Sequence, residues 1–81
     1  MTYSVKVIVM PLKDLLDPQG KAVLTGLNNL GITAMKDVRI GKNIELEIEA
    51  ESPEKAKAIA EEAAKKLLAN AVMEYFEVVV Q

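Results

Sequence analysis

Residues 3–10 have the sequence YSVKVIVM, which is typical of a β-strand because β-branched residues dominate it. Side chains alternate between the two faces of a strand. One face carries Tyr3, Val5, Val7 and Val9. The other face carries Ser4, Lys6, Ile8 and Met10, so it is partly apolar and we expect it to be partly covered. Pro11 ends the strand, since proline has no N–H to donate to a neighbouring strand.

A helix is predicted after this strand. Asp17-Pro18 is a typical helix start, because the carboxylate accepts from free backbone N–H groups and proline suits the first helical position. Apolar residues then recur with helical spacing at Val23, Leu24, Leu27 and Leu30, and Gly31 ends the helix. Gly20 and Gly26 inside it each cost roughly 1 kcal/mol relative to alanine. Two explanations of these glycines stay open: another backbone segment approaches the helix closely at that position, or the helix simply tolerates a glycine there.

Two alternating segments follow, separated by Gly41-Lys42. Ala34–Ile40 is predicted as a strand with Val38 and Ile40 on one face. In the second segment, Ile44, Leu46 and Ile48 alternate with Glu45, Glu47 and Glu49. A Gly-X pair between two such runs predicts a tight hairpin in which the glycine adopts a positive φ.

The last third of the chain predicts a helix and a strand. Ser52-Pro53-Glu54 repeats the helix-start pattern of Asp17-Pro18, and Asn70 is a plausible stop. The apolar stripe of this helix comprises Ala56, Ile59, Ala60, Ala63, Ala64, Leu67 and Leu68. Residues 73–80 (MEYFEVVV) form the final strand, with Phe76, Val78 and Val80 on one face.

The predicted order is β-α-β-β-α-β in a single domain spanning residues 1–81. This order favours an α+β, two-layer, ferredoxin-like fold: a four-stranded antiparallel sheet with both helices on one face. The first and third strands then lie at the centre, and Lys6 faces Glu45 and Glu47. The back of the sheet carries Ile8, Met10, Met35, Tyr75 and Val79. An apolar strip on so small a domain indicates an interface, and we expect dimerisation through the sheet.

The composition excludes several classes of function. The 81 residues contain no histidine and no cysteine, so the chain has no thiolate nucleophile, disulfide or zinc ligand, and we expect no catalytic residue or metal site. Glu45, Glu47 and Glu49 are the weak alternative, as oxygen ligands for a hard cation. A net charge of −2 argues against nucleic acid. No apolar run of membrane-spanning length and no signal peptide is visible, so we expect a cytoplasmic protein.

Two short segments carry the remaining chemical signals. The loop Asp17-Pro18-Gln19-Gly20 precedes a helix, where a phosphate could bind, but Asp17 repels anions. Arg39 and Lys42 flank the predicted turn, and docking against an acidic or carbonyl-rich protein surface suits two cations better than nucleic acid does.

These two segments, Asp17–Gly20 and Asp37–Lys42 (DVRIGK), together resemble the PurS-type small subunit of phosphoribosylformylglycinamidine (FGAM) synthase. The resemblance covers essentially the whole chain, from VKVIV to EVVV. It implies a role in purine biosynthesis, within a complex that uses ATP and glutamine-derived ammonia. It further implies a large synthetase subunit that binds ATP and Mg, a glutaminase subunit, and a small subunit that bridges them as a homodimer or tetramer. The small subunit is then neither catalytic nor cofactor-binding.

The resemblance also implies roles for individual residues. Asp17, Gln19, Arg39 and Lys42 become candidate partner-interface residues. Ile8, Met10 and Tyr75 are further interface candidates, on the separate ground that they belong to the apolar strip of the back face. Pro18, Gly20 and Gly41 become structural residues of the two motifs. The alternative is a small-ligand (amino-acid) sensing βαββαβ domain, in which the loop of residues 11–20 would bind the effector.

Overall fold

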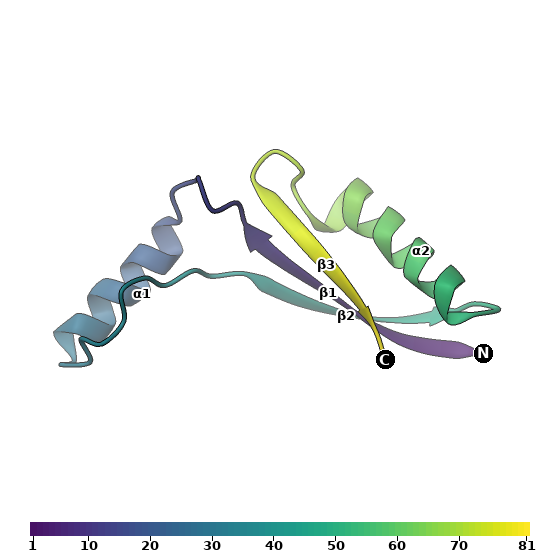
Figure 1. The fold of residues 1–81 in the computed structure, drawn as a ribbon, viewed down its shortest axis with the longest axis horizontal. Helices are drawn as coiled ribbons and strands as arrows, with labels where there is room; N and C mark the ends of the chain where they lie inside the picture. Colours follow the sequence, from purple (N-terminus) through teal and green to yellow (C-terminus); the bar gives the residue numbers. More distant parts are fainter.

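A computed structural model describes all residues, 1–81, as an antiparallel sheet with two helices (Figure 1). The sheet has three strands in the order β2-β1-β3: β1 (Thr2–Pro11), β2 (Lys42–Glu49) and β3 (Glu74–Val80). The helices are α1 (Pro18–Asn29) and α2 (Pro53–Ala63), and α2 continues into a π-helical turn, η1 (Ala64–Leu68).

Strand β1 lies at the centre of the sheet as predicted, and the predicted third strand, β2, is its neighbour. The prediction that this third strand is also central is wrong, because the fourth strand that would flank it does not form and β2 lies at an edge. Lys6 of β1 pairs with Glu45 on one side and with Val79 on the other. The register therefore confirms that Lys6 faces the glutamates of β2. Both sides of β1 are hydrogen-bonded, so β2 and β3 are the two edges of the sheet.

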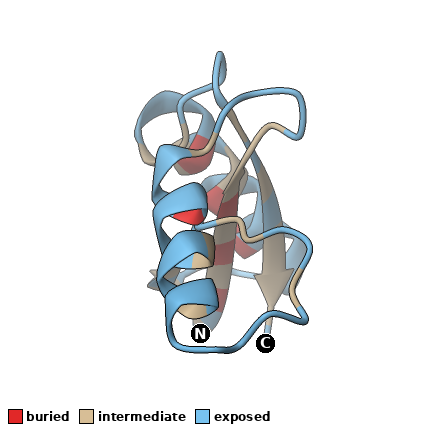
Figure 2. Cartoon of the chain, turned by 90° about the vertical axis from the view of Figure 1, so that its left-hand side faces the viewer, coloured by how far each residue is buried: buried red, intermediate tan, exposed pale blue.

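The core lies between β1 and α2. Its fully buried side chains are Val5, Val7 and Val9 of the strand and Ala56, Ala60 and Ala64 of the helix. Alanine side chains end at Cβ, so the helix backbone lies close to the sheet and the valine methyls fill the space between them. Around this centre pack Tyr3, Ile44, Leu46, Ile48, Phe76, Val78 and Val80. Figure 2 shows buried residues concentrated in this layer.

The π-helical turn changes which leucine faces the core. In η1 the N–H of Ala69 donates to the carbonyl of Ala64, five residues earlier, at 2.9 Å. A π turn contains more residues than an α turn, so each residue rotates through a smaller angle. Leu68 consequently packs against the core while Leu67 points outward and is 84% exposed. The predicted apolar stripe is wrong at Leu67, and also at Ile59, which is exposed.

Helix α1 does not lie on the sheet, so the prediction of two helices on one face is wrong. It projects away from the other elements together with the segment that returns to β2 (Figure 1). We call residues 12–41 the arm and the remainder the body. Gly20 is the only buried residue of α1, and Figure 2 shows the helix almost entirely exposed.

The predicted fourth strand and its hairpin are also wrong. Residues 32–41 are extended but form no strand, and the chain runs through Gly41 into β2 without reversing (Figure 1). Gly41 has no positive φ; the only glycine that does is Gly31, with φ +85°, at the end of α1. Met35 therefore lies in the arm and not on the back of the sheet.

The shape leaves much surface exposed. The molecule measures 50 × 24 × 14 Å and its radius of gyration is 16.0 Å, whereas a compact chain of this length has about 12 Å. Its accessible surface is 5888 Å², against about 4,800 Å² for a compact monomer of this mass. The projecting arm accounts for the difference in shape, because its helix α1 does not pack closely against any of the three strands.

Candidate functional site

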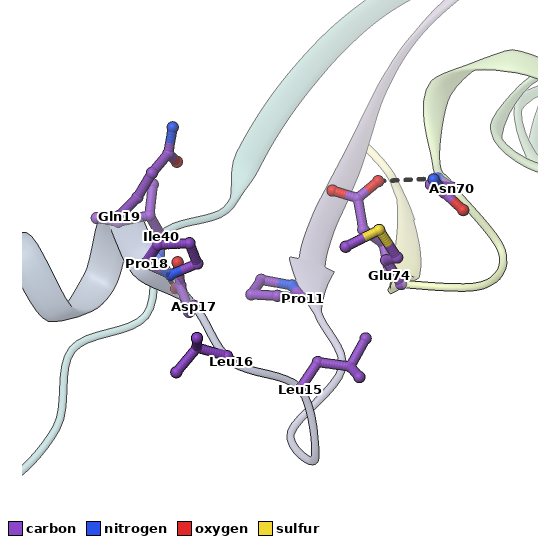
Figure 3. Close-up of a pocket in the computed structure, with 10 residues that line it drawn as sticks. Pro11, Leu15, Leu16, Asp17, Pro18, Gln19, Ile40, Asn70 and Glu74 are labelled. Atoms are coloured by element: carbon purple, nitrogen blue, oxygen red, sulfur yellow. Dashed lines mark hydrogen bonds between the residues drawn. The ribbon is translucent and has the colours of Figure 1, made fainter.

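Asp17 connects the start of the arm to its end. Its Oδ1 accepts from the N–H of Gly20 at 3.0 Å, which caps α1 as predicted. Its Oδ2 accepts from the N–H of Ile40 at 2.8 Å, 23 residues further along the chain. One carboxylate thus joins the two segments by which the arm leaves and re-enters the body (Figure 3).

The hydrogen bonds that Asp17 accepts favour its charged form. Those from the backbone N–H groups of Gly20 and Ile40 are the main reason that the pKa of Asp17 is lowered from its ordinary value, and the neighbouring Arg39 guanidinium adds to the effect. Arg39 itself donates through Nη2 to the carbonyl oxygen of Pro11, at the end of β1. Its side chain therefore also joins the returning segment to the body.

Two glycines allow these segments to approach closely. A Cβ on Gly20 would collide with the carbonyl of Val38 and lie 2.7 Å from Oδ2 of Asp17. A Cβ on Gly41 would collide with the carbonyl of Val9 and with Sδ of Met10. We call Asp17, Gly20, Arg39, Ile40 and Gly41 the clasp. The close-contact explanation holds for Gly20, whereas Gly26 has no neighbour within 4 Å and is simply tolerated.

Lys42 holds the first residue of β2 against the part of the body where η1 ends and β3 begins, at the end nearest the arm. Its Nζ donates to the carbonyl of Leu68 at 3.4 Å and lies 4.0 Å from Oε2 of Glu74. Oε1 of Glu74 in turn accepts from the N–H of Asn70 at 2.8 Å. Lys42 and Arg39 therefore both make contacts within the chain.

A hollow of about 400 Å³ lies between the clasp and the turn that precedes β3 (Figure 3). Its lining combines Leu15, Leu16 and Ile40 of the arm with Asn70, Met73 and Glu74 of the body. Gln19 also lies at this hollow, and its amide makes no hydrogen bond within the chain. Its side-chain amide is therefore free to bind a partner.

The back face of the sheet collects the other predicted residues. Met10 pairs with Tyr75, and Lys6 with Val79, so these side chains share the face of β1 that α2 does not cover. Ile8 lies between Met10 and Lys6 on the same face. The remaining back-face residues of β2 and β3 are mainly acidic: Glu45, Glu47, Glu49 and Glu77. These glutamates do not converge, and no group of three carboxylates in the chain could hold a metal ion.

The clasp and the back face both suit binding and not bond-making chemistry. The charged groups of the clasp hold backbone segments, and the exposed groups of the sheet form a broad surface. Comparison with known proteins decides between the candidate functions. Residues 4–81 match the family PurS, described as phosphoribosylformylglycinamidine (FGAM) synthase. The chain belongs to the PurS family. Its function is therefore that of the PurS subunit of FGAM synthase, in purine biosynthesis, and not that of an amino-acid sensor.

Relatives of known function agree across nearly the whole chain. The PurS subunit of FGAM synthase from Methanocaldococcus jannaschii is 39% identical over 79 residues, covering 98% of this chain and 95% of the relative. The PurS subunit from Bacillus subtilis is 44% identical over 72 residues, covering 89% of this chain and 84% of the relative. Both relatives are named as subunits of the synthase.

Solved structures share the fold. A chain in the structure of PurLQS from Thermotoga maritima superposes with a TM-score of 0.92 at 33% identity, covering 100% of this chain and 99% of that one. The M. jannaschii PurS crystal structure gives a TM-score of 0.87 at 39% identity, covering 98% and 95%. The three-stranded sheet with a projecting α1 is therefore a PurS architecture.

Sequence reasoning selected most residues of the PurS clasp but not their purpose. It named Asp17, Gly20, Arg39 and Gly41 and expected a helix cap, docking cations and a hairpin glycine. It missed the Pro11 carbonyl and the Ile40 N–H, because backbone groups carry no signal in the side-chain pattern. A detectable signal was present in the two motifs: each combines a charged residue with a glycine, as close backbone contact requires.

The two glycines of α1 offer a matched test of the clasp. We expect Gly20→Ala to destabilise the protein by more than about 1 kcal/mol, because its Cβ would collide with the Val38 carbonyl. We expect Gly26→Ala to stabilise the protein by about 0.5–1 kcal/mol, because alanine favours the helix and meets nothing. Urea unfolding measures both. Equal effects of the two substitutions would contradict the close contact at Gly20.

The lowered pKa of Asp17 predicts how the clasp depends on pH. A carboxyl group whose pKa is lowered by folding stabilises the folded state above its ordinary pKa, and this contribution is lost as the pH falls through the lowered value. At pH 7, Asp17→Ala should therefore increase amide hydrogen exchange at Gly20 and Ile40 severalfold, as measured by NMR. The difference from the wild type should shrink below about pH 4. Asp14→Ala, which removes an exposed carboxylate outside the clasp, should change neither amide.

Proposed function

We propose that this chain bridges the synthetase and glutaminase subunits of FGAM synthase and supports ammonia transfer between them. The full-length match to a chain of the T. maritima PurLQS structure carries the proposal. Release of ammonia from glutamine proceeds through a cysteine activated by a base, and this chain contains neither cysteine nor histidine. Ammonia must then come from another subunit. ATP and Mg bind, in this proposal, to the large synthetase.

We propose further that the chain acts as a homodimer formed by its arms. Its accessible surface exceeds that of a compact monomer by about 1,100 Å². Each partner buries about 800 Å² in a standard protein interface. Apolar side chains are also unburied along the arm, at Val23, Leu30 and Ile32. A second copy would therefore complete a core that the arm lacks by itself.

The back face of the partner's sheet is the surface that suits the arm. It is uncovered, and Ile8, Met10 and Val79 form its apolar centre. Its edges are acidic, whereas the arm has four cations and three aspartates and so a net charge of +1. Tyr75 would lie at the rim of this interface. Two such dimers would give a tetramer, the other assembly implied by the resemblance.

The clasp would serve this assembly by holding the arm at one angle. Fixing a segment in its bound conformation lowers the entropy lost on association. Asp17 and Arg39 then act on the interface indirectly, through the backbone groups that they hold. Gln19, with its free amide, and Lys42 are the residues we propose for direct polar contacts with the partner subunits.

The substrates of FGAM synthase indicate the cellular compartment in which the complex works. None of the helices is both long and apolar enough to cross a lipid bilayer. We place the complex in the cytoplasm, where the ATP and glutamine that it consumes are available.

Reconstitution tests the bridging role. Omitting this chain from a mixture of synthetase and glutaminase subunits should abolish glutamine-dependent FGAM synthesis, because ammonia is then lost to solvent. Synthesis from added ammonium chloride should largely survive, since the synthetase active site stays intact. Both rates are measured as ATP-dependent product formation. Full glutamine-dependent activity without this chain would refute the bridging role.

A charge placed on the arm tests the homodimer. Leu30 is 76% exposed, so Leu30→Asp should leave the monomer folded while placing a carboxylate in the interface. Light scattering should show the wild type at twice 8.8 kDa or a higher multiple, and the variant at 8.8 kDa. Thr25→Asp is the control, because Thr25 lies on the opposite side of α1 from the apolar stripe. A wild-type monomer would contradict the homodimer.

A further inference from the structure

Most of the arm forms one unit, residues 17–40, which we call the lever. Oδ2 of Asp17 accepts from the N–H of Ile40, so the start of α1 is bonded to the end of the returning segment. Beside this bond, Gly20 packs so closely on the carbonyl of Val38 that a side chain would not fit. Helix α1 and the returning segment are therefore joined to each other where the lever meets the body.

The lever is attached to the body by fewer contacts. Its helix α1 does not pack closely against any strand. Arg39 donates to the carbonyl oxygen of Pro11 at the end of β1, and no other side chain of the lever is hydrogen-bonded to the body. The outgoing residues 13–16 make one backbone hydrogen bond, from the N–H of Leu15 to the carbonyl of Leu12, and that bond lies within the arm. Arg39 thus holds the position of the lever relative to β1.

Two short stretches allow the lever to rotate relative to the body. On the outgoing side, the N–H of Leu12 is bonded to the carbonyl of Met73, and the turn at residues 13–16 follows. On the returning side, Gly41 is the last residue before β2, and glycine changes its backbone angles at the lowest steric cost. Hinges in proteins consist of a few such residues, which absorb the change in φ and ψ. Each connection of the lever therefore contains a hinge.

The hollow of about 400 Å³ beside the clasp gives the rotation a direction (Figure 3). Its wall on the arm contains Leu15, Leu16 and Ile40, which are 40%, 65% and 37% exposed. Its wall on the body contains Met73, which is 52% exposed. Rotation of the lever toward the turn that precedes β3 brings these apolar walls together and removes them from water.

The charged residues of the hollow favour the open position. Asp17 on the arm and Glu74 on the body are its only charged lining residues, and both are acidic. Bringing two carboxylates together costs free energy, and the open position also keeps the bond from Arg39 to Pro11. Burial of the apolar walls acts in the opposite direction. Opposing interactions of this kind allow two positions to be populated.

We propose that the lever rotates about Gly41 and residues 13–16, between the observed open position and a closed position in which the hollow has disappeared. Arg39 is the latch of the open position, because rotation about a residue only two positions away breaks its bond to Pro11. The inference goes beyond the bridging function. In the proposed homodimer, release of the latch changes the angle between the two bodies while each arm stays bound to its partner.

Pairs of introduced cysteines test the proposal, because the chain has no cysteine of its own. Spin labels at Asn28→Cys on α1 and Lys57→Cys on α2 report the distance between lever and body by pulsed electron paramagnetic resonance; both positions are exposed. The labelled chain is assembled with an excess of unlabelled protein, so that only distances within one copy are measured. We expect one major distance that matches the open position and a shorter one from the closed position.

Two variants should increase the closed population. Arg39→Ala removes the latch and should raise the fraction of the shorter distance about threefold or more, as the loss of one hydrogen bond allows. Glu74→Gln removes one of the two carboxylates but still accepts from the Asn70 N–H, and it should raise the same fraction. Lys36→Ala and Glu77→Gln are the matched controls, since both residues are exposed and lie outside the hollow, and they should leave the fraction unchanged.

A disulfide across the hollow is the second test. Leu16→Cys and Met73→Cys place thiols on its two walls, and a disulfide forms only when the two Cα atoms come within about 7 Å of each other. Oxidation should trap the closed position, so that the shorter distance alone remains. Reduction should restore both distances.

One unchanged distance in the wild type, Arg39→Ala and Glu74→Gln would overturn the proposal. A broad distribution in Arg39→Ala would overturn it too, because the lever would then be loose and would have no second position. So would a disulfide that forms without any change in distance. If Arg39→Ala does not fold, as judged by circular dichroism, Glu74→Gln and the disulfide decide. The bridging function is independent of all these results, since reconstitution tests it separately.

Discussion

The close packing of three alanines of α2 on three valines of β1 is the contact on which the rest of the structure depends. Alanine lets the helix lie near the sheet, and the β-branched valines form both the strand and the surface beneath the helix. Fully buried side chains occur only in this layer. The core is therefore one-sided: it binds α2 to one face of the sheet and leaves the other face and the arm with no core of their own.

This one-sided core explains how a small chain can serve as an adaptor. The arm is held to the body by the clasp, which uses hydrogen bonds and close backbone contact and not apolar burial. A segment held in this way keeps its apolar side chains available for another molecule. In our proposals the arm and the back face join two copies, and the assembled protein bridges subunits of another kind. Association, in effect, supplies the apolar contacts that the body does not provide.

Prediction from the sequence succeeded where a pattern depends on one element alone. The structure confirms the alternation of side chains in β1, β2 and β3 and the helix caps at Asp17 and Ser52. It also confirms that Lys6 pairs with Glu45. It failed for residues 34–40, because alternation at Val38 and Ile40 indicates an extended backbone but not a hydrogen-bonding neighbour. It also failed at Gly41, since a glycine required for close approach and a glycine required for positive φ look the same in a sequence.

The sequence by itself determined the secondary elements of the body and the valine and alanine faces that meet in the core. It also showed that histidine and cysteine are absent, and it contained the two motifs by which the family can be recognised. Only the tertiary structure decided that α1 leaves the sheet, that both motifs form one clasp, and that Leu67 faces solvent. The physical reason is that local patterns record which way each side chain points. The partner of a backbone N–H, or the extra residue in a helical turn, depends on chain segments that are distant in sequence.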